Sequence, residues 1–433
     1  MKKIGVGLLG CGVVGEAVYR GLAENAKAIS ARCGFQFDVK KIAVNNISKK
    51  RVGVSGGLLT KKYMEVVQAP GVDIVVELMG GEEDAFTAVT TALKLKKHVV
   101  TANKLLLAKR GEEIFDLAQK AGVKIGFEAS VAGAVPVIRT IKEAIASGKI
   151  KSVFGIINGT SNFILSSMME RQTTFADALE EAQNLGYAEA DPTFDVAGID
   201  AAHKLTILAN LAFGTPVKLK DVHIEGIGLL TPDDFIFARQ FGRVIKLLAT
   251  AKNDDGKLDI RVHPAMVPAN MPIARIDGVT NAVEVDVSDA GRLMLIGPGA
   301  GGDATASAVI ADLVDIARDM AHCSSARVSP TGFLPHSRKR LPLKNIDSIK
   351  GGYYLRFTVD DKPGVLAKMA GILGDNGISI DSVIQKGRTG GIVPLVILTH
   401  EAVEKSVKKA INKIDRLSTS QARTMLIRLE DGL

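Results

Sequence analysis

Short apolar runs alternate with amphipathic stretches along the first 135 residues. The apolar runs predict buried strands, and the stretches between them, such as Ala85–Leu95 and Gly111–Ala121, repeat their apolar positions with the period of a helix. Strands that are buried on both faces and alternate with helices form a parallel sheet, so we predict a doubly wound α/β domain over residues 1–135. The predicted strands are Ile4–Leu9, Val39–Val44, Ile74–Leu78, His98–Thr101 and Val123–Glu128.

The pattern changes between residues 136 and 302. Amphipathic helices, near Thr174–Leu185 and Ala201–Leu211, are followed mainly by strand-like segments, which predicts an α+β domain of a different character. A glycine-rich run, Leu295–Asp303, then leads into a helical pattern over about residues 303–322, and we expect this helix to return to the first domain. The predicted strands of the middle domain are Val153–Ile157, Val222–Ile227, Lys257–Met266 and Asn281–Asp286.

A third unit follows a segment rich in Ser, Arg, Lys and Pro, residues 323–350, which we interpret as an extended linker. Residues 351–433 then show the order β-α-β-β-α-β, which is typical of a ferredoxin-like module. Its predicted strands are Tyr354–Val359, Ile378–Gln385, Ile392–Thr399 and Ala422–Leu429, and its predicted helices are Val365–Asp375 and Glu401–Ile414.

Composition narrows the class of protein. A chain of 433 residues with 46% apolar and 24% charged side chains is expected to fold into two or three globular domains. The net charge of +8 is scattered, and the chain has no Trp and only 5% aromatic residues, which argues against nucleic-acid binding. Cys11, Cys33 and Cys323 lack paired spacing, so we expect neither disulfides nor zinc. Glycines interrupt the first apolar run, so we expect no signal sequence, no membrane span and a cytoplasmic protein.

The first predicted strand runs directly into a glycine loop that opens a helix. Gly10 permits the tight turn, Gly12 allows a pyrophosphate to approach the backbone, and Gly15 allows the helix to pack on the strand, with Val13 and Val14 between them. Because the loop has both its strand and its helix, we predict a Rossmann-type dinucleotide site here. The alternative is a tight turn without a ligand.

The choice between NAD and NADP stays open. The second predicted strand ends at Asn45 and Asn46, where an acid that binds the ribose is often found, and the basic run 49–51 follows. An amide can bind a ribose hydroxyl without repelling a 2′-phosphate, and the cations could attract one. A solvated basic loop is the alternative.

Two lysines are candidates for the reacting centre. Lys104 follows Thr101 at the carboxyl edge of the predicted sheet, where ligands of this fold bind, although such a lysine is more often a surface residue. Lys204 lies four residues after Asp200, so both share a helical face at the start of an apolar helix, and a lysine so placed suits proton transfer. The preceding loop holds three further carboxylates, Glu189, Asp191 and Asp195; its alternative interpretation is a solvated loop with helix-capping aspartates.

Two small-residue turns complete the candidates. Gly159 and Thr160 follow a strand and begin a helix, so their backbone N–H groups could bind an anionic substrate group, although a simple N-cap is almost equally favoured. The turn from Glu128 to Pro136 offers carbonyls and one carboxylate, ligands that suit a hard monovalent cation. Composition alone favours a hinge at this turn.

Taken together, these motifs resemble homoserine dehydrogenase. Between Ala182 and Lys204 the chain is similar to that family's signature, and the resemblance covers essentially the whole chain. The matching signature positions are Gly186, Asp191, Pro192, Asp195, Gly198, Asp200 and Lys204. Segments similar to those of the family, in the same order, are Glu77–Gly81, Thr101–Lys104, Glu128–Val131, Asn158–Asn162 and Gly299–Gly301.

The resemblance implies reversible transfer of hydride between NAD(P)H and L-aspartate 4-semialdehyde, which gives L-homoserine for threonine, methionine and isoleucine biosynthesis. It implies that Lys104, Lys204 and Asp200 lie at the reacting centre, with Lys204 as the usual proton donor. The implied substrate-binding residues are Glu189, Asp195, Asp200, Gly159, Thr160 and Gly186. The implied cofactor-binding residues are Gly10, Gly12, Val13, Val14, Gly15, Asn45, Thr101, Lys104 and Gly301.

The resemblance also implies features beyond the reacting centre. It implies a structural sodium ion at Glu128, Val131, Gly133 and Val135. Residues 351–433 resemble an ACT domain, which implies an amino-acid effector, threonine being the natural candidate, and a homodimer or homotetramer is expected. Two positions depart from the family. Asn45 and Asn46 replace the Arg and Asp of many relatives, which leaves the use of NADP open, and Ala304 replaces the usual Pro before Thr305, which should alter only the start of the helix.

Two rival functions have distinct requirements. A phosphorylating semialdehyde dehydrogenase needs a thiolate nucleophile, and the three cysteines are poorly placed for that role. A regulatory protein without catalysis would bind the nucleotide but show no turnover.

Overall fold

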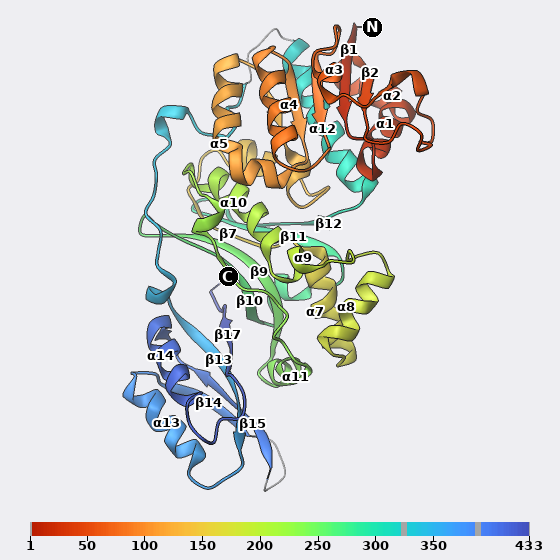
Figure 1. Cartoon of the computed structure of the whole chain (residues 1–433). Coiled ribbons are helices and arrows are strands. Elements are labelled where there is room, and N and C mark those ends of the chain that lie inside the picture. The colour runs from red at the N-terminus through yellow and green to blue at the C-terminus, as the bar shows by residue number, and fades with distance from the viewer. Residues whose placement is uncertain (1, 322–326, 386–390, 433) are drawn as a thin grey trace. The chain divides into compact units, whose positions relative to one another are not determined.

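The computed structural model describes residues 2–321, 327–385 and 391–432, drawn as ribbons in Figure 1. The chain divides into two compact units. The first unit comprises residues 1–157, 201–222 and 280–341, and the second comprises residues 158–200, 223–279 and 342–433. Cys323 and the last residue of the predicted helix 303–322 lie outside the described residues.

The first unit contains the parallel sheet that the sequence predicted. Its strands follow the order β3-β2-β1-β4-β5-β6, and every neighbouring pair is parallel. The central strand β4 is buried along its whole length, as expected for a sheet covered on both faces. The bounds are β1 (Lys2–Leu9), β2 (Phe35–Ala43), β3 (Leu59–Thr60), β4 (Ile74–Glu77), β5 (His98–Thr101) and β6 (Ile125–Gly126).

Six helices accompany this sheet in the described part of the first unit. The predicted return helix is confirmed, because Ala306, Val309 and Leu313 of α12 share a buried core with Val18 and Leu22 of α1. The bounds are α1 (Val13–Glu24), α2 (Ala26–Cys33), α3 (Tyr63–Val67), α4 (Glu83–Lys94), α5 (Lys104–Ala121) and α12 (Gly302–Ala321).

The first unit also holds three antiparallel strands in the order β12-β11-β7. The start of the predicted glycine-rich loop at Leu295 is wrong, because residues up to Pro298 pair with β11 as part of β12. The bounds here are β7 (Ile150–Ile156), β11 (Thr280–Val287), β12 (Gly291–Pro298), the short helix α6 (Val137–Arg139) and α10 (Ile199–Phe213), which begins in the second unit.

The second unit is built on strands in the order β9-β10-β17-β13-β15-β14, with β8 beside β10 and β16 beside β13. Residues 350–429 form the predicted β-α-β-β-α-β arrangement with one added short strand, and we call them the C-terminal module. The bounds of the strands are β8 (His223–Ile224), β9 (Arg243–Asp254), β10 (Lys257–Pro268), β13 (Lys350–Asp360), β14 (Ile380–Gln385), β15 (Ile392–Thr399), β16 (Ala402–Val403) and β17 (Met425–Leu429). The helices are α7 (Gly159–Arg171), α8 (Phe175–Asn184), α9 (Thr193–Val196), α11 (Pro232–Gln240), α13 (Val365–Asp375) and α14 (Glu404–Ile414).

Two features of the second unit differ from the sequence prediction. The strand predicted over Val222–Ile227 is limited to His223–Ile224, and the chain then leaves the sheet. The module's strand β17 pairs in parallel with β10, Arg428 opposite Ala265, so the module adds to the sheet of β9 and β10 within this unit. Over the ranges that the structure describes, no helix is long and apolar enough to cross a bilayer.

Candidate active site

The glycine loop after β1 has the geometry of a dinucleotide site. Gly10 has a φ of +98°, and a Cβ there would lie 2.5 Å from the carbonyl oxygen of Leu78. A Cβ on Gly15 would lie 2.4 Å from the carbonyl oxygen of Gly10, whereas one on Gly12 would meet open space. The first and third glycines therefore permit close packing, and the second leaves the start of α1 accessible to a ligand.

The second glycine run reaches the first. A Cβ on Gly302, the first residue of α12, would lie 2.9 Å from Cγ1 of Val13, and Gly301 before it has a φ of +108°. Two helix N-termini from segments almost 300 residues apart thus lie beside one glycine loop. This placement agrees with the predicted return of the chain to the cofactor crevice.

A cavity of about 470 Å³ opens beside the loop. Asn45, Lys49, Arg51 and Lys61 line it, with the glycine loop at one side. Arg51 donates from Nε to the carbonyl of Cys11 at 2.9 Å and from Nη1 to the carbonyl of Lys49, so it fastens the basic segment to the glycine loop. Burial raises the pKa of the Cys11 thiol, which opposes a role as a thiolate nucleophile.

Glu77, at the carboxyl end of β4, binds the residues at the ends of β4 and β5. It was not predicted as a site residue from its own chemistry. Its fully buried carboxylate accepts a hydrogen bond from Thr101 Oγ1 at 2.7 Å and others from backbone N–H groups, including that of Met79. Asn103 caps α5, whose first residue is the half-buried Lys104. The sequence does contain a signal for this role, because Glu77 is a carboxylate at the end of an otherwise apolar strand.

In the second unit Asn158 gathers the acidic residues of the signature. Its Nδ2 donates to Asp195 Oδ1 at 2.7 Å and to Asp200 Oδ2 at 2.8 Å, while its Oδ1 accepts from the Ser161 N–H at the start of α7. The sequence predicted only an N-cap or an anion site at this motif. An asparagine that bridges two aspartates was missed because the bridge joins residues about 40 positions apart.

The other predicted substrate residues of the second unit differ in their local environments. Thr160 Oγ1 donates to the carbonyl of Tyr187 at 2.7 Å. Gly186 has a φ of +74° after α8, and Glu189 is exposed on the following loop. Asp191 accepts the Thr193 N–H and therefore caps a turn, as the alternative interpretation expected.

Lys204 is buried on α10, one turn after Asp200 on the same helix. It is 9% exposed, and its Nζ donates to the carbonyl of Ile157 at 2.7 Å within the first unit. Ile157 immediately precedes Asn158 in the chain. The burial agrees with the inference drawn from the spacing of the lysine on an apolar helix.

The Glu128 turn is a buried segment of the first unit that contains two residues in the left-handed backbone region. Ala132 and Gly133 have φ values of +55° and +57°, and the Glu128 carboxylate accepts the N–H groups of Ile138 and Arg139 at 2.7 and 2.9 Å. Burial, together with the nearby carboxylate of Asp312, raises the pKa of Glu128 to about 7. Among the described residues no group of three or more His, Cys, Asp or Glu side chains could hold a metal, so a cation here would need backbone carbonyls.

Family models match most of the chain. Residues 136–314 match the model for homoserine dehydrogenase, residues 10–128 match the model for the homoserine dehydrogenase NAD-binding domain, and residues 353–416 match the ACT domain. With the sheets described above, these matches confirm the predicted fold class of a Rossmann-type sheet, an α+β part and a ferredoxin-like ACT module.

Individual relatives give the same result. The homoserine dehydrogenase of Neisseria gonorrhoeae is 43% identical over 431 residues, with 99% of both chains covered. The crystal structure of a homoserine dehydrogenase from Thiobacillus denitrificans has a TM-score of 0.94 at 46% identity and covers 100% of this chain and 99% of that one. A hyperthermophilic archaeal homoserine dehydrogenase in complex with NADPH has a TM-score of 0.63 at 27% identity and covers 72% of this chain and 97% of its own.

Proposed function

Because the chain belongs to the homoserine dehydrogenase family of NAD(P)-dependent oxidoreductases, we propose that the glycine loop, Lys204 and the acidic turn of residues 195–200 act together in the reversible reduction of L-aspartate 4-semialdehyde to L-homoserine. The observation that carries the assignment is the Asn158 bridge between Asp195 and Asp200. It holds two carboxylates in one place, where they suit the ammonium group of an amino-acid substrate.

The proposed roles follow from position and chemistry. Asp195, Asp200 and Glu189 bind and orient the substrate, with help from the Gly159–Thr160 and Gly186 backbone. Lys204 donates a proton to the alkoxide that develops at the substrate carbonyl, because its burial and its place one turn after Asp200 suit proton transfer. Lys104 orients the reacting end at the edge of β5. The bound nicotinamide supplies the hydride.

Kinetics test this proposal directly. Homoserine-dependent formation of NAD(P)H should be measured for the wild type and for Lys204→Ala, whose kcat should fall by about 10²- to 10⁴-fold. Thermal melting and binding of the dinucleotide serve as controls that the variant is folded. Absence of turnover in the wild type with either nucleotide, or full activity of Lys204→Ala, would contradict the proposal.

We propose further that the cofactor pocket accepts both nucleotides and favours NADP. The support is the cationic lining by Lys49, Arg51 and Lys61 around an exposed Asn45. Replacing Lys49 and Lys61 together by Gln should raise the KM for NADP by about tenfold, which corresponds to ~1.4 kcal/mol, with the KM for NAD within about twofold. Equal changes for both nucleotides would oppose a 2′-phosphate site.

The residues of the Glu128 turn fit a sodium ion in their chemistry, and we propose that they hold one. The turn holds a buried carboxylate near that of Asp312, and the positive φ values of Ala132 and Gly133 curl the backbone into a tight turn. The ligands would be the oxygens of Glu128, Val131, Gly133 and Val135. The ion would neutralise charge in the fold and take no part in hydride transfer.

The remaining proposals concern organisation. We assign residues 1–135 and 303–322 to nucleotide binding, 136–302 to substrate binding, 323–350 to a linker and 351–433 to regulation. We also propose a cytoplasmic homodimer or homotetramer that serves threonine, methionine and isoleucine synthesis and responds to threonine. Light scattering and initial rates measured with and without threonine test the assembly and the response.

A further inference from the structure

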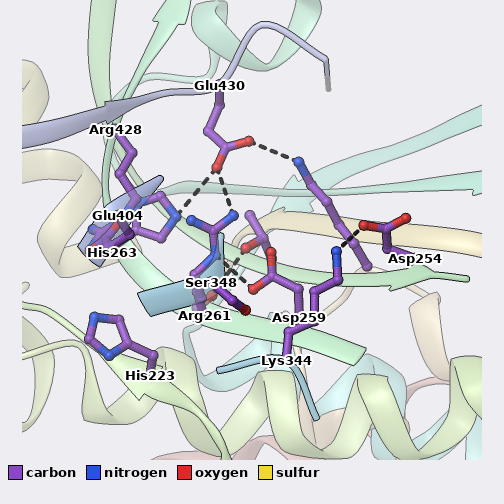
Figure 2. Close-up of polar contacts among 12 residues, drawn as sticks. His223, Asp254, Asp259, Arg261, His263, Lys344, Ser348, Glu404, Arg428 and Glu430 are labelled. Atoms are coloured by element: carbon purple, nitrogen blue, oxygen red, sulfur yellow. Dashed lines mark hydrogen bonds and ion pairs between the residues drawn. The ribbon is translucent and has the colours of Figure 1, made fainter. Parts of the chain in front are cut away.

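Arg428, on strand β17 of the C-terminal module, joins two parts of the second unit. It is 3% exposed and binds the carboxylate of Glu225 with two parallel hydrogen bonds of 2.7 and 2.8 Å. On its other side it binds Glu404 of α14, which also accepts a hydrogen bond from Tyr353. Figure 2 shows Arg428 beside Glu404 in this charged cluster. The guanidinium therefore links the buried interior of the module to the segment that follows β8.

Glu225 begins that segment, and residues 225–227, which we call the β8 loop, lie directly on the signature. A Cβ on Gly226 would lie 2.5 Å from the carbonyl oxygen of Val196 and 2.8 Å from Cα of Ala197. The Ile227 N–H donates to the same carbonyl of Val196 at 2.9 Å. Only a glycine fits at this contact, so a shift of the β8 loop would displace the backbone of residues 196–197.

Those two residues lie inside the acidic turn. The carbonyl of Asp195 accepts the Gly198 N–H at 3.0 Å and the hydroxyl of Ser161 at 3.0 Å, and the side chains of Asp195 and Asp200 share the amide of Asn158. All of these contacts fall within the second unit. The path from Arg428 to the two aspartates thus has two steps: a bidentate ion pair, and a close contact between two backbones.

We propose that Arg428 is a positioning residue for the substrate carboxylates: through Glu225 and the β8 loop, the C-terminal module sets the placement of Asp195 and Asp200 and so the affinity for the amino-acid substrate. The inference rests on the proposed function of those aspartates. Without Arg428, the Glu225 carboxylate keeps the contact to His223 at 2.7 Å, and the Glu225 N–H keeps its bond to the carbonyl of Val262 at 2.7 Å. The partly exposed carboxylate turns to water, so the β8 loop loses the side-chain contact that fixes its position relative to the module.

The arrangement permits chemical rescue. Glu225 and Arg428 both line a cavity of about 540 Å³ together with Leu229, Pro264 and Met425, so the space left by a truncated arginine is open to a small planar cation. Guanidinium at low millimolar concentration, far below denaturing levels, should bind Glu225 in Arg428→Ala and restore the pair. Rescue of this kind would separate positioning from general loss of stability.

The experiment compares steady-state kinetics of the full chain in three forms: wild type, Arg428→Gln and Arg356→Gln. Arg356 is the matched control, because it also belongs to the module and makes a bidentate pair, at 2.6 and 3.0 Å, but with Asp234 at the start of α11. Arg428→Gln should raise the KM for homoserine by about tenfold, with the KM for the nucleotide within about twofold and kcat lowered less than the KM is raised. Arg356→Gln should leave the KM for homoserine within about twofold.

Two outcomes would overturn the proposal: an unchanged KM for homoserine in Arg428→Gln, or an equal rise in Arg356→Gln. If Arg428→Gln does not fold, Glu225→Gln takes its place with the same expectation, and guanidinium rescue of Arg428→Ala must lower the KM for homoserine without altering that of wild type. Lack of any homoserine turnover in the wild type would instead contradict the proposed function itself, so the two failures are distinguishable.

Discussion

Each unit of the molecule contains a cluster of buried carboxylates: Glu128 and Asp312 in the first unit, and Glu404 and Glu430 in the second. The pKa values of the two clusters are shifted in opposite directions. In the first unit, burial raises the pKa of Glu128 to about 7 and that of Asp312 to about 6. In the second unit, burial also opposes ionisation, yet Lys252 and Arg261 hold the pKa of Glu430 down at about 2. Figure 2 shows Glu430 in contact with Arg261 and His263.

The difference lies in the partners and not in the depth of burial. Glu128 accepts hydrogen bonds from backbone N–H groups and lies near Asp312, whose contact with the Arg139 guanidinium is long, at 3.7 Å. Glu430, in contrast, lies 2.9 Å from the ammonium of Lys252 and 3.2 Å from the guanidinium of Arg261. Asp319 of the first unit supports this explanation, because Lys124 and Arg327 lower its pKa despite burial. In these two clusters a cationic side chain within hydrogen-bonding distance lowers the pKa of a buried acid, and a more distant one does not offset the effect of burial.

The largest expected effect comes from removing a partner in the second cluster. Glu404→Gln removes the fully buried counter-charge of Arg428, which then keeps only the partly exposed Glu225, and should lower the free energy of unfolding by ~3–5 kcal/mol. Glu128→Gln should cost only ~1–3 kcal/mol, because Glu128 is already close to its neutral form near pH 7 and loses mainly one hydrogen bond. Urea unfolding of both variants at pH 7 measures these two losses of free energy. Equal losses would contradict the difference between the two clusters.

Acid should weaken the second cluster. Burial, aided by Arg261 and Arg428, lowers the pKa of His263 to about 3 from 6.5. A depressed folded-state pKa contributes stability that is present above 6.5 and is lost as pH falls toward 3, by about 1.4 kcal/mol per pH unit for one proton. Glu430, depressed from 4.5 to about 2, adds a loss below pH 4.5 with the same sign.

Urea midpoints measured between pH 7.5 and 4.5 test this dependence. The matched variant is His263→Asn, which has no group that titrates in this range and should flatten the slope between pH 6.5 and 4.5. A slope that is the same in both proteins would show that His263 is not the source.

The smallest expected effect concerns sodium at the first cluster. If the ion takes the place that a cationic side chain has in the second unit, replacing choline by 100 mM sodium at constant ionic strength should raise the Tm by a few degrees. Glu128→Gln should abolish the increase. Glu404→Gln serves as the control and should keep it, since its cluster already has cationic side chains.

The sequence predicted those parts of the molecule whose signals are local. The strand, glycine loop and helix at Gly10–Gly15 follow from neighbouring residues, and the burial of Lys204 follows from helical spacing. Strand β9 was missed, because its Leu247–Ala251 segment favours a helix by composition, and only its pairing with β10 over twelve residues makes it a strand.

The contacts within the site could not be predicted either, because they also join residues that are far apart in the sequence. Asn158 meets Asp195 and Asp200 across 37 and 42 positions, and the Glu128 N–H meets Asp312 across 184. No periodicity in the chain records such pairs. The opposite ionisation of the two clusters likewise depends on partners that only the fold brings near.

The parallel pairing of β10 with β17 has a consequence for synthesis on the ribosome. The edge of β10 at Ala265–Met266 pairs with Arg428–Leu429, which are synthesised about 160 residues later. At ~5–20 residues per second, that edge of the nascent chain stays open for about 8 to 30 s. During this interval it offers unpaired N–H and C=O groups to any neighbouring nascent chain, so a trigger factor or another holdase that covers β10 should increase the soluble yield.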